Sequence, residues 1–512
     1  MTVRLVPNTL KPKRSKHLVF LSSEGVILNH NLGASLSNAC LKHGQQIALR
    51  SAEFEVSYQE LYNKAIVLAN RLNELGIEAD EPVIVSVSNQ VADVIAVLAV
   101  WLAHAVIVPV HRSSPPDVIN GLQHKTKARF HINGIVHIVS EIIPPKREIL
   151  GGAAFVIFTS GSTGEPKGVV VSHASFLSKI TEINRLLNFE NHESTLLVLN
   201  INFSFGLWVC LLTLLTGGRL VMQEKFEPLA FLNLLQAQQI NRVGMVPTMM
   251  RTIFSKVELS EEVGKINQQS SLKQILIGGE SLGTSLAQSI RKQFSNSHLI
   301  DIYGSTETAT CDFFLFPKDF VNYPGCIGRP SGEVQFRIVD KNEEPLALGE
   351  IGELQIYSPF LMNGYLDDPH LTEIAFNNKW FKTGDLAREV DKSVVELMGR
   401  SKELISRGGN KITPGEIEQV ICAHPDIAAA MAVGLPDDIL GERIHVLLVL
   451  KVGANQEALN MRSFLNQKLE KYKQPDVFYL LSELPLGRTG KADRGQFKNK
   501  ILSHSLNPIS IT

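Results

Sequence analysis

The chain has 512 residues, of which 44% are hydrophobic and 20% charged, an ordinary globular composition that excludes disorder over the whole length. Its 50 Lys and Arg residues nearly balance 51 Asp and Glu residues, so the charge points neither to nucleic acid nor to a membrane surface. The five cysteines have no CxxC spacing, which argues against a disulfide framework and a structural zinc site and favours reduced thiols in a cytoplasmic protein.

Early in the chain, two short runs rich in Val and Ile flank a helical segment. Residues 83–87 and 106–110 predict buried strands, and residues 94–103 predict the helix between them. This βαβ pattern is typical of a parallel sheet covered on both faces. The apolar stretch 94–110 is near the length of a membrane span, but its β-type end and the preceding Asp93 favour a buried helix and strand.

The chain divides into three regions with different predicted secondary structure. Up to about residue 320, strands at 153–158, 196–199, 220–222, 243–246 and 273–277 and helices at 207–215 and 226–239 predict α/β layers. Strands at 335–339, 352–357 and 394–398, separated by turn residues, predict a small β-rich subdomain, here expected to be a barrel. Beyond residue 402, helices at 414–423 and 457–471 and strands at 429–433 and 445–450 predict a compact α+β unit.

The most informative motif is the segment 158–169, which follows a predicted apolar strand. Its run of Ser, Thr and Gly can point backbone N–H groups and hydroxyls at one centre, which suits a polyphosphate. The motif is not a Walker A sequence, because Lys167 follows Pro166 and precedes Gly168. A surface linker is the alternative, although linkers are unusual between two apolar strands.

Three later segments carry groups with matching chemistry. In the segment 301–308, Tyr303 can stack on a base, Thr306 can donate to a phosphate and Glu307 can ligate Mg²⁺. Asp385 lies in a Thr-Gly-Asp turn that suits a ribose diol, and Lys491 lies on a Gly-bounded loop. Each of these segments alone is equally explained by a surface turn or a solvated lysine.

Together and in this order, the motifs resemble the AMP-forming adenylating superfamily, which includes acyl-CoA synthetases, peptide-synthesis adenylation domains and beetle luciferases. The resemblance runs from about Leu36 to Lys498 and includes the segments 278–280, 352–354, 364–365, 399–400, 407–412 and 434–437. It implies an α/β fold with an N-terminal AMP-binding domain over 1–400, made of two α/β subdomains and the β-rich subdomain from about 325. It also implies a mobile C-terminal domain over 401–512, with its hinge near Lys402.

The resemblance also implies site residues. Thr306, Glu307 and Lys491 would be catalytic, with Glu307 holding Mg²⁺ and Lys491 bridging the carboxylate and the α-phosphate. Asp301 stands where the family often has Asn, which keeps an acceptor and loses a donor. The residues expected to bind the nucleotide are Thr159, Ser160, Gly161, Ser162, Thr163, Gly164 and Lys167 for the phosphates, Gly278, Gly279, Glu280, Asp301, Ile302 and Tyr303 around the adenine, Asp385 and Arg400 for the ribose, and also Gly304, Ser305, Thr306 and Lys491.

The implied reaction uses ATP and Mg²⁺ to activate a carboxylic acid as an acyl-adenylate, and then passes the acyl group to a phosphopantetheine thiol, with CoA as the expected acceptor. Gly408 and Gly409 would line the thiol tunnel, unless they form an ordinary tight turn. The sequence ends about twenty residues past Lys491, so we expect the thiol to come from a separate molecule. The alternative is a stand-alone acyl-AMP ligase that loads a carrier protein. A non-catalytic nucleotide-binding relative is disfavoured because Lys491, Glu307 and Asp385 are all present, and nothing favours a luciferase-like oxygenation.

The acid is expected to lack an α-amino group. Adenylation domains for amino acids place an Asp in a segment that aligns with 203–209, where Gly206, or Ser204 after a two-residue shift, supplies no charge. The residues expected to line the acyl pocket are Gly206, Leu207, Cys210, Ile277, Ile302 and Cys326. These apolar or small residues suit an uncharged aliphatic or aryl acid, although plain core packing would also explain them.

Overall fold

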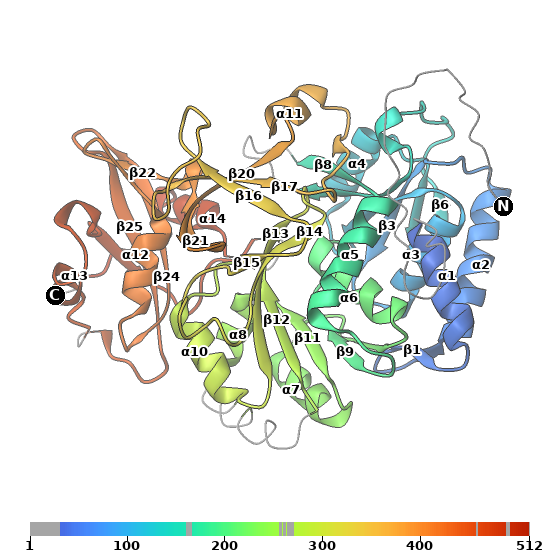
Figure 1. Ribbon diagram of the computed structural model, residues 1–512, viewed down its shortest axis with the longest axis horizontal. Coiled ribbons are helices and arrows are strands. Elements are labelled where there is room, and N and C mark those ends of the chain that lie inside the picture. Colours follow the sequence, from blue (N-terminus) through green and yellow to red (C-terminus); the bar gives the residue numbers. More distant parts are fainter. Residues whose placement is uncertain are drawn as a thin grey trace, which may run out of the picture.

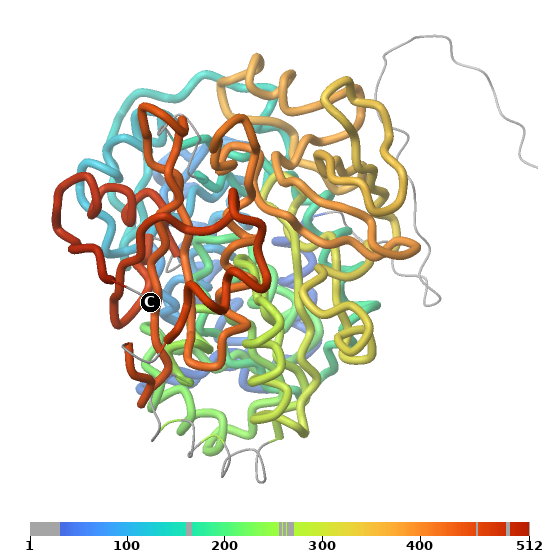
Figure 2. The backbone as a smooth tube through the Cα atoms, turned by 90° about the vertical axis from the view of Figure 1, so that its left-hand side faces the viewer, coloured from blue at the N-terminus to red at the C-terminus, as the bar shows by residue number. Residues whose placement is uncertain are grey.

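The computed structural model describes residues 31–159, 166–254, 259, 263, 271–456, 459–487 and 492–510. In this part of the chain the strands form four sheets, and Figure 1 shows the C-terminal sheet at the opposite end of the molecule from α1 and α2. Figure 2, which views the molecule from the left-hand side of Figure 1, shows the C-terminal segments, in red, in front of the larger N-terminal part.

The first large sheet has nine described strands, largely parallel, with antiparallel strands at both edges. In spatial order they are β15 (Arg329–Pro330), β14 (Thr310–Leu315), β13 (His298–Ser305), β12 (Gln274–Gly278), β11 (Arg242–Met245), β9 (Ser194–Leu197), β10 (Arg219–Met222), β1 (Ile47–Arg50) and β2 (Glu55–Ser57).

The second large sheet has seven described strands, and its central strands β7, β4, β3 and β5 run parallel. Its order is β18 (Gly364–Tyr365), β8 (Lys167–Ser172), β7 (Ala153–Thr159), β4 (Val106–His111), β3 (Pro82–Val87), β5 (Phe130–Asn133) and β6 (Ile135–Ile138). The strands β3 and β4 are almost wholly buried, as their continuous β-branched runs predict.

Helices pack in the core between these sheets. The largest core cluster joins Phe155 of one sheet to Leu276 of the other, with Phe176 of α5 (His173–Leu187) and Trp208 of α6 (Ser204–Leu215) among its members. A helix that is hydrophobic nearly all round, such as α6, is expected in such a buried layer. The other helices of this part are α1 (Leu32–His43), α2 (Tyr58–Glu74), α3 (Val91–Leu102), α4 (Pro116–Thr126), α7 (Pro228–Ala237), α8 (Pro247–Phe254) and α10 (Thr284–Gln293).

Two smaller sheets complete the described fold. The β-rich subdomain orders β16 (Gln335–Val339), β17 (Gly352–Tyr357), β20 (Trp380–Asp391) and β19 (Phe376–Asn377), with β21 (Val394–Arg400) paired to β20, and it carries α11 (Pro369–Ile374). The C-terminal sheet orders β23 (Asn410–Ile412), β22 (Ile405–Arg407), β25 (Gly441–Leu450) and β24 (Ile427–Asp437), with β26 (Val477–Leu480) paired to β25. Its helices are α12 (Pro414–Cys422), α13 (Met461–Asn466) and α14 (Arg494–Leu502).

The predicted α/β fold is confirmed, with two corrections of detail. The β-rich region has β16 and β19 at the two ends of its strand order, so it is an open sheet and the predicted barrel is wrong. The predicted helix 457–471 is too long, since within the described residues α13 covers only Met461–Asn466, preceded by Asn460 in a left-handed conformation. No described helix is long and apolar enough to cross a membrane, and the stretch 94–110 divides into α3 and β4 as expected.

Candidate functional site

The predicted adenine segments meet at the carboxyl ends of two neighbouring parallel strands. Strand β12 ends at Gly278 and pairs with β13, so that Ile277 lies opposite Asp301 and Gly278 opposite Ile302. A Cβ added to Gly278 would lie 2.4 Å from the carbonyl oxygen of Ile302, so only glycine permits this close approach. Ligands of open α/β sheets commonly bind at the carboxyl ends of such strands, and the arrangement agrees with that rule.

The ribose candidates form a hydrogen-bonded triad with Tyr303. Asp385 on β20 and Arg400 at the end of β21 lie directly opposite each other, with Arg400 Nε 3.1 Å from Asp385 Oδ1. The Tyr303 hydroxyl donates to the other carboxylate oxygen at 2.6 Å. Burial raises the pKa of Asp385, while Arg400 and the tyrosine hydroxyl oppose that shift. The structure thus joins residues 82 positions apart, a contact that the sequence could not reveal.

The Glu280 carboxylate, at the edge of this site, is bound by two neighbouring side chains. Its carboxylate accepts hydrogen bonds from the Thr248 hydroxyl at 2.8 and 3.0 Å, and Arg251 lies 3.3 Å away. Both partners come from α8, which therefore holds the loop after β12 in place. This supports a structural contribution of Glu280 to the adenine side of the site, and its contact with a nucleotide stays a prediction.

The turn that follows β13 carries both described catalytic candidates. The Thr306 hydroxyl lies 3.4 Å from that of Ser204, the first residue of α6. The Glu307 carboxylate accepts a hydrogen bond of 3.1 Å from the Tyr365 hydroxyl, and Lys167 Nζ lies 5.0 Å from the centre of the Tyr365 ring. The turn therefore lies between the predicted phosphate lysine and the start of the helix expected to face the acid.

Two of these contacts were not foreseen. Tyr365 belongs to the motif 364–365, but no local pattern connects it with Glu307, since 58 positions separate them. From the sequence, Ser204 is only a shifted alternative to Gly206. Its position at the N-terminus of α6, facing Thr306, could have been inferred only with the helix start known.

The described residues include the two ends of the predicted phosphate loop but not the lysine predicted to be catalytic. Thr159 and Lys167 lie opposite each other at the ends of the antiparallel strands β7 and β8. The predicted residues Ser160, Gly161, Ser162, Thr163, Gly164 and Lys491 lie outside the described residues. Their roles remain predictions from the sequence.

The acyl-pocket candidates are all buried, which does not separate a pocket lining from core packing. Leu207, Cys210 and Ile302 belong to the core cluster between the two large sheets, whereas Ile277 belongs to the cluster on the other face of the nine-stranded sheet. A Cβ at Gly206 would lie 2.3 Å from the carbonyl oxygen of Asn200. Close backbone packing therefore explains this glycine without a ligand, and its place in a pocket stays a prediction, as does that of the buried Cys326.

The hinge and tunnel candidates lie on exposed backbone. Lys402 is exposed in a short 3₁₀ turn, Ser401–Glu403, directly after β21. Gly408 and Gly409 connect β22 to β23 with φ values of 56° and 82°, the left-handed conformations that a two-residue hairpin turn requires. The turn geometry explains both glycines, and their role in a thiol tunnel is untested.

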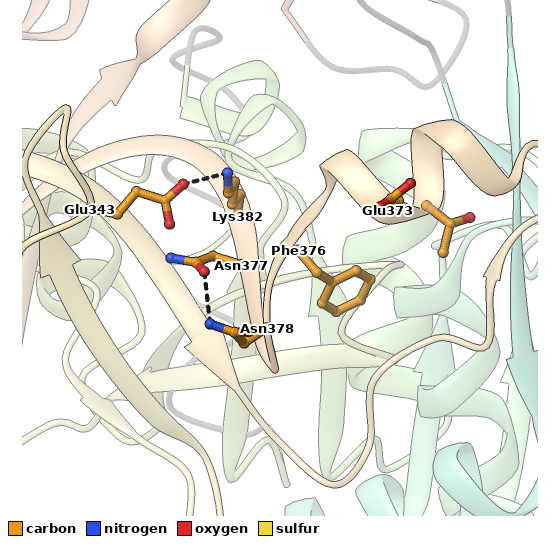
Figure 3. Close-up of a pocket in the computed structure, with 7 residues that line it drawn as sticks. Glu343, Glu373, Phe376, Asn377, Asn378 and Lys382 are labelled. Atoms are coloured by element: carbon orange, nitrogen blue, oxygen red, sulfur yellow. Dashed lines mark hydrogen bonds and ion pairs between the residues drawn. The ribbon is translucent and has the colours of Figure 1, made fainter.

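A surface cavity of about 480 Å³ lies apart from these residues, in the β-rich subdomain. Figure 3 shows Lys382 paired with Glu343 on one side and Phe376 on the other, and the two charged atoms are 2.6 Å apart. None of the predicted site residues lines this cavity. Among the described residues, no three His, Cys, Asp or Glu side chains gather as a metal-binding group.

Replacing Tyr365 with Phe is expected to raise the Mg²⁺ concentration needed for half-maximal activity by about 10-fold, because the Glu307 carboxylate loses the group that orients it. The ring over Lys167 is retained. Tyr357→Phe is the matched control, because it also removes the hydroxyl of a tyrosine whose ring lies beside a lysine. Lys379 Nζ lies 4.4 Å from the centre of that ring. An unchanged Mg²⁺ titration for Tyr365→Phe, or an equal shift for the control, would contradict the expectation.

Burial raises the pKa of Asp301 to about 7, against an unfolded-state value of about 3.9. The folded protein therefore binds this proton more tightly, and its stability falls as pH rises from about 4 to 7. Asp301→Asn removes this titration, so its melting temperature relative to the wild type is expected to increase between pH 5 and pH 8. Thermal unfolding of both proteins across that range checks this, and a pH-independent difference would contradict it.

Comparisons with known proteins place these motifs in a family. The sequence profile described as AMP-binding enzyme matches residues 36–150 and 151–366, and the profile described as AMP-binding enzyme C-terminal domain matches residues 416–491. The predicted superfamily and enzyme class are confirmed. The profiles leave 367–415 between them, so the predicted domain boundary at 400/401 is not tested.

Named relatives cover nearly the whole chain. A 2-succinylbenzoate–CoA ligase of Bacillus licheniformis is 27% identical, over 88% of this chain and 96% of its own length. A feruloyl-CoA synthase of an Amycolatopsis species is 26% identical, over 88% and 95%. The solved structure of ATP-bound MatB from Rhodopseudomonas palustris superposes with a TM-score of 0.82 at 22% identity, over 92% of this chain and 99% of that one, which shows the same fold. From the profile matches, the chain belongs to the family of AMP-binding enzymes.

Proposed function

We propose that this enzyme uses MgATP to convert a carboxylic acid into an acyl-adenylate with release of pyrophosphate, and then transfers the acyl group to CoA. The observation that carries the proposal is the position of the Thr306–Glu307 turn. It contacts Tyr365, whose ring lies beside Lys167, and it also contacts Ser204 at the start of α6. Groups suited to phosphate, to a metal ion and to the acid thus converge on one turn.

The chemistry needs these groups because a carboxylate is a poor electrophile at neutral pH. When the acid oxygen attacks the α-phosphorus of ATP, negative charge increases on the α-phosphate oxygens and pyrophosphate leaves. Preorganised donors such as the Thr306 hydroxyl and a lysine stabilise that charge, and positioning of the two reactants contributes much of the rest. Lys491 is the lysine that the sequence predicts for this role.

The donor set fits Mg²⁺. One oxygen of Glu307 accepts from Tyr365, which leaves its second oxygen for a ligand. Mg²⁺ prefers oxygen ligands and is commonly bound through one or two carboxylates together with substrate phosphates, so a single protein carboxylate is sufficient. Bound Mg²⁺ would supply charge neutralisation at the phosphates, while Glu307 would hold it and Tyr365 would orient Glu307.

For the acid, we propose an aryl carboxylic acid without an α-ammonium group. The start of α6 offers Ser204 and the half-buried Phe205, which stacks on Trp208 with ring centres 5.6 Å apart, and no charged side chain. A buried ammonium without a carboxylate partner would be unfavourable there. The names of the two relatives, a 2-succinylbenzoate–CoA ligase and a feruloyl-CoA synthase, support an aromatic acid and CoA as acceptor. We further propose a cytoplasmic location, where ATP and CoA are available.

The test is pyrophosphate release with MgATP across aryl, aliphatic, dicarboxylic and amino acids, each with and without CoA, with the products identified by mass spectrometry. Acyl-CoA from aryl acids is the expected product. Activity confined to amino acids would overturn the substrate class. Acid-dependent pyrophosphate release that never yields acyl-CoA would overturn CoA as acceptor and indicate a carrier protein instead.

A further inference from the structure

Behind the catalytic turn lies an ion pair that is fully shielded from solvent. Lys179 of α5 and Asp312 of β14 are both 0% exposed, and Lys179 Nζ lies 2.8 Å from Asp312 Oδ1. The Thr308 hydroxyl, also 0% exposed, donates to the second oxygen of Asp312. These three residues, the Lys179–Asp312–Thr308 network, have no place in the chemistry described above.

The network is attached to the backbone of the turn that carries Thr306 and Glu307. The Ser305 N–H donates to the Thr308 hydroxyl oxygen at 3.2 Å, which closes the turn around the two catalytic candidates. Directly after the turn, Ala309 and Thr310 have φ values of 60° and 129°, which non-glycine residues rarely adopt. Such strained backbone persists only where its surroundings hold it in place.

The same network also contacts the segment on the other side of the turn. The ring of Phe360 lies 5.2 Å from Lys179 Nζ. Two residues later, the Met362 N–H donates to the carbonyl oxygen of Glu307 at 2.8 Å, and Tyr365 binds the Glu307 side chain. The turn is therefore held on one side by Thr308, which binds Asp312, and on the other by the segment 360–365, which contacts Lys179 through Phe360.

A contribution to folding stability alone does not explain why this ion pair is buried. Replacing a buried ion pair by apolar side chains of similar volume is often neutral or stabilising, because burial of two charges carries a large desolvation cost. A fully satisfied polar network does, however, fix one geometry. Because this network is attached to a strained turn, the geometry that it fixes is the geometry of that turn.

We propose that the Lys179–Asp312–Thr308 network is a positioning device that holds Thr306 and Glu307 in the geometry needed to bind the phosphates and Mg²⁺. The inference rests on the proposed function of that turn. The three residues touch no reactant and act through the backbone and through the Phe360–Tyr365 segment. Groups that orient a metal-binding carboxylate commonly change metal affinity or activity by about 10- to 100-fold when removed.

The test compares Thr308→Val, which removes the hydroxyl at nearly constant volume, with Thr308→Ser, which restores it. The control is Thr213→Val, since Thr213 is 1% exposed and its hydroxyl donates to a helix carbonyl at 2.8 Å far along α6 from Ser204. For each full-length protein, ATP binding is measured by calorimetry with and without Mg²⁺ and no acid present, together with kcat and KM for pyrophosphate release.

Thr308→Val is expected to weaken the Mg²⁺-dependent part of ATP binding and to lower kcat, each by about 10-fold or more. Thr308→Ser should restore both, and Thr213→Val should leave both unchanged even if its melting temperature falls equally. Values for Thr308→Val within about twofold of the wild type, or the same losses in Thr213→Val, would overturn the proposal.

The outcome for the network is separable from that for the proposed function. A wild-type protein that binds MgATP but releases no pyrophosphate with any acid would overturn the function, while the binding comparison would still decide the network. A wild type whose ATP binding does not respond to Mg²⁺ would overturn both.

Discussion

Replacing Glu307 with glutamine is expected to lower acid-dependent pyrophosphate release by about 100-fold or more, because the turn loses its one charged oxygen donor for Mg²⁺. The substitution nearly conserves volume and leaves an amide oxygen to accept from the Tyr365 hydroxyl. The loss should therefore reside in kcat and in the Mg²⁺ requirement, with little change in melting temperature. Steady-state kinetics at several Mg²⁺ concentrations measure both quantities.

Glu280→Gln is the informative comparison within the same site. Its carboxylate is engaged by Thr248 and Arg251, so its loss should disturb the loop after β12 and raise KM for ATP more than it lowers kcat. If Glu307→Gln kept at least half of the wild-type rate at every Mg²⁺ concentration, the assignment of Glu307 as metal ligand would be wrong.

Lys179→Met is expected to give the largest loss of stability, about 3–5 kcal/mol of unfolding free energy, because it leaves the Asp312 carboxylate buried without its cation. The double variant Lys179→Met/Asp312→Leu removes both charges and should recover most of that loss. Urea unfolding of the wild type, the single variant and the double variant measures the difference. A single variant as stable as the double one would show that Asp312 becomes neutral or solvated at little cost.

The single and double variants separate the effect of the network on folding stability from its effect on the position of the turn. The double variant regains stability but lacks the Asp312 carboxylate that accepts from the Thr308 hydroxyl, so its turn should remain poorly fixed. Pyrophosphate release by a stable double variant is therefore expected to stay low.

The sequence predicted the large sheets well because their strands carry a strong local signal. Residues 83–87 and 106–110 are runs rich in β-branched residues, which are typical of buried parallel strands, as β3 and β4 are. The helix predicted at 457–471 shows the limit of that reasoning. Within it, the buried Met461 and Leu465 lie four positions apart and support the short α13, but Asn460 adopts a left-handed conformation just before that helix.

At the site, the sequence indicated candidate residues but not the hydrogen bonds that join them. Motif order indicated Tyr303, Asp385 and Glu307, but the bonds Tyr303–Asp385 and Tyr365–Glu307 join distant positions that no local pattern connects. Gly206 shows the converse problem. A glycine that permits close backbone packing and one that opens a pocket look the same in a sequence, and the 2.3 Å approach to Asn200 becomes visible only in three dimensions.

The end of β21 joins the predicted ribose pair to the predicted hinge. Arg400, which pairs with Asp385, is the last residue of that strand, and the exposed 3₁₀ turn with Lys402 begins at the next residue. Two residues span at most about 7 Å of chain. The Arg400 guanidinium, which is expected to face the ribose, is therefore joined by a very short span of chain to the backbone that leads into the C-terminal sheet. If the hinge lies near Lys402, as the sequence predicts, a rotation of the smaller part of the molecule would begin at the same strand end.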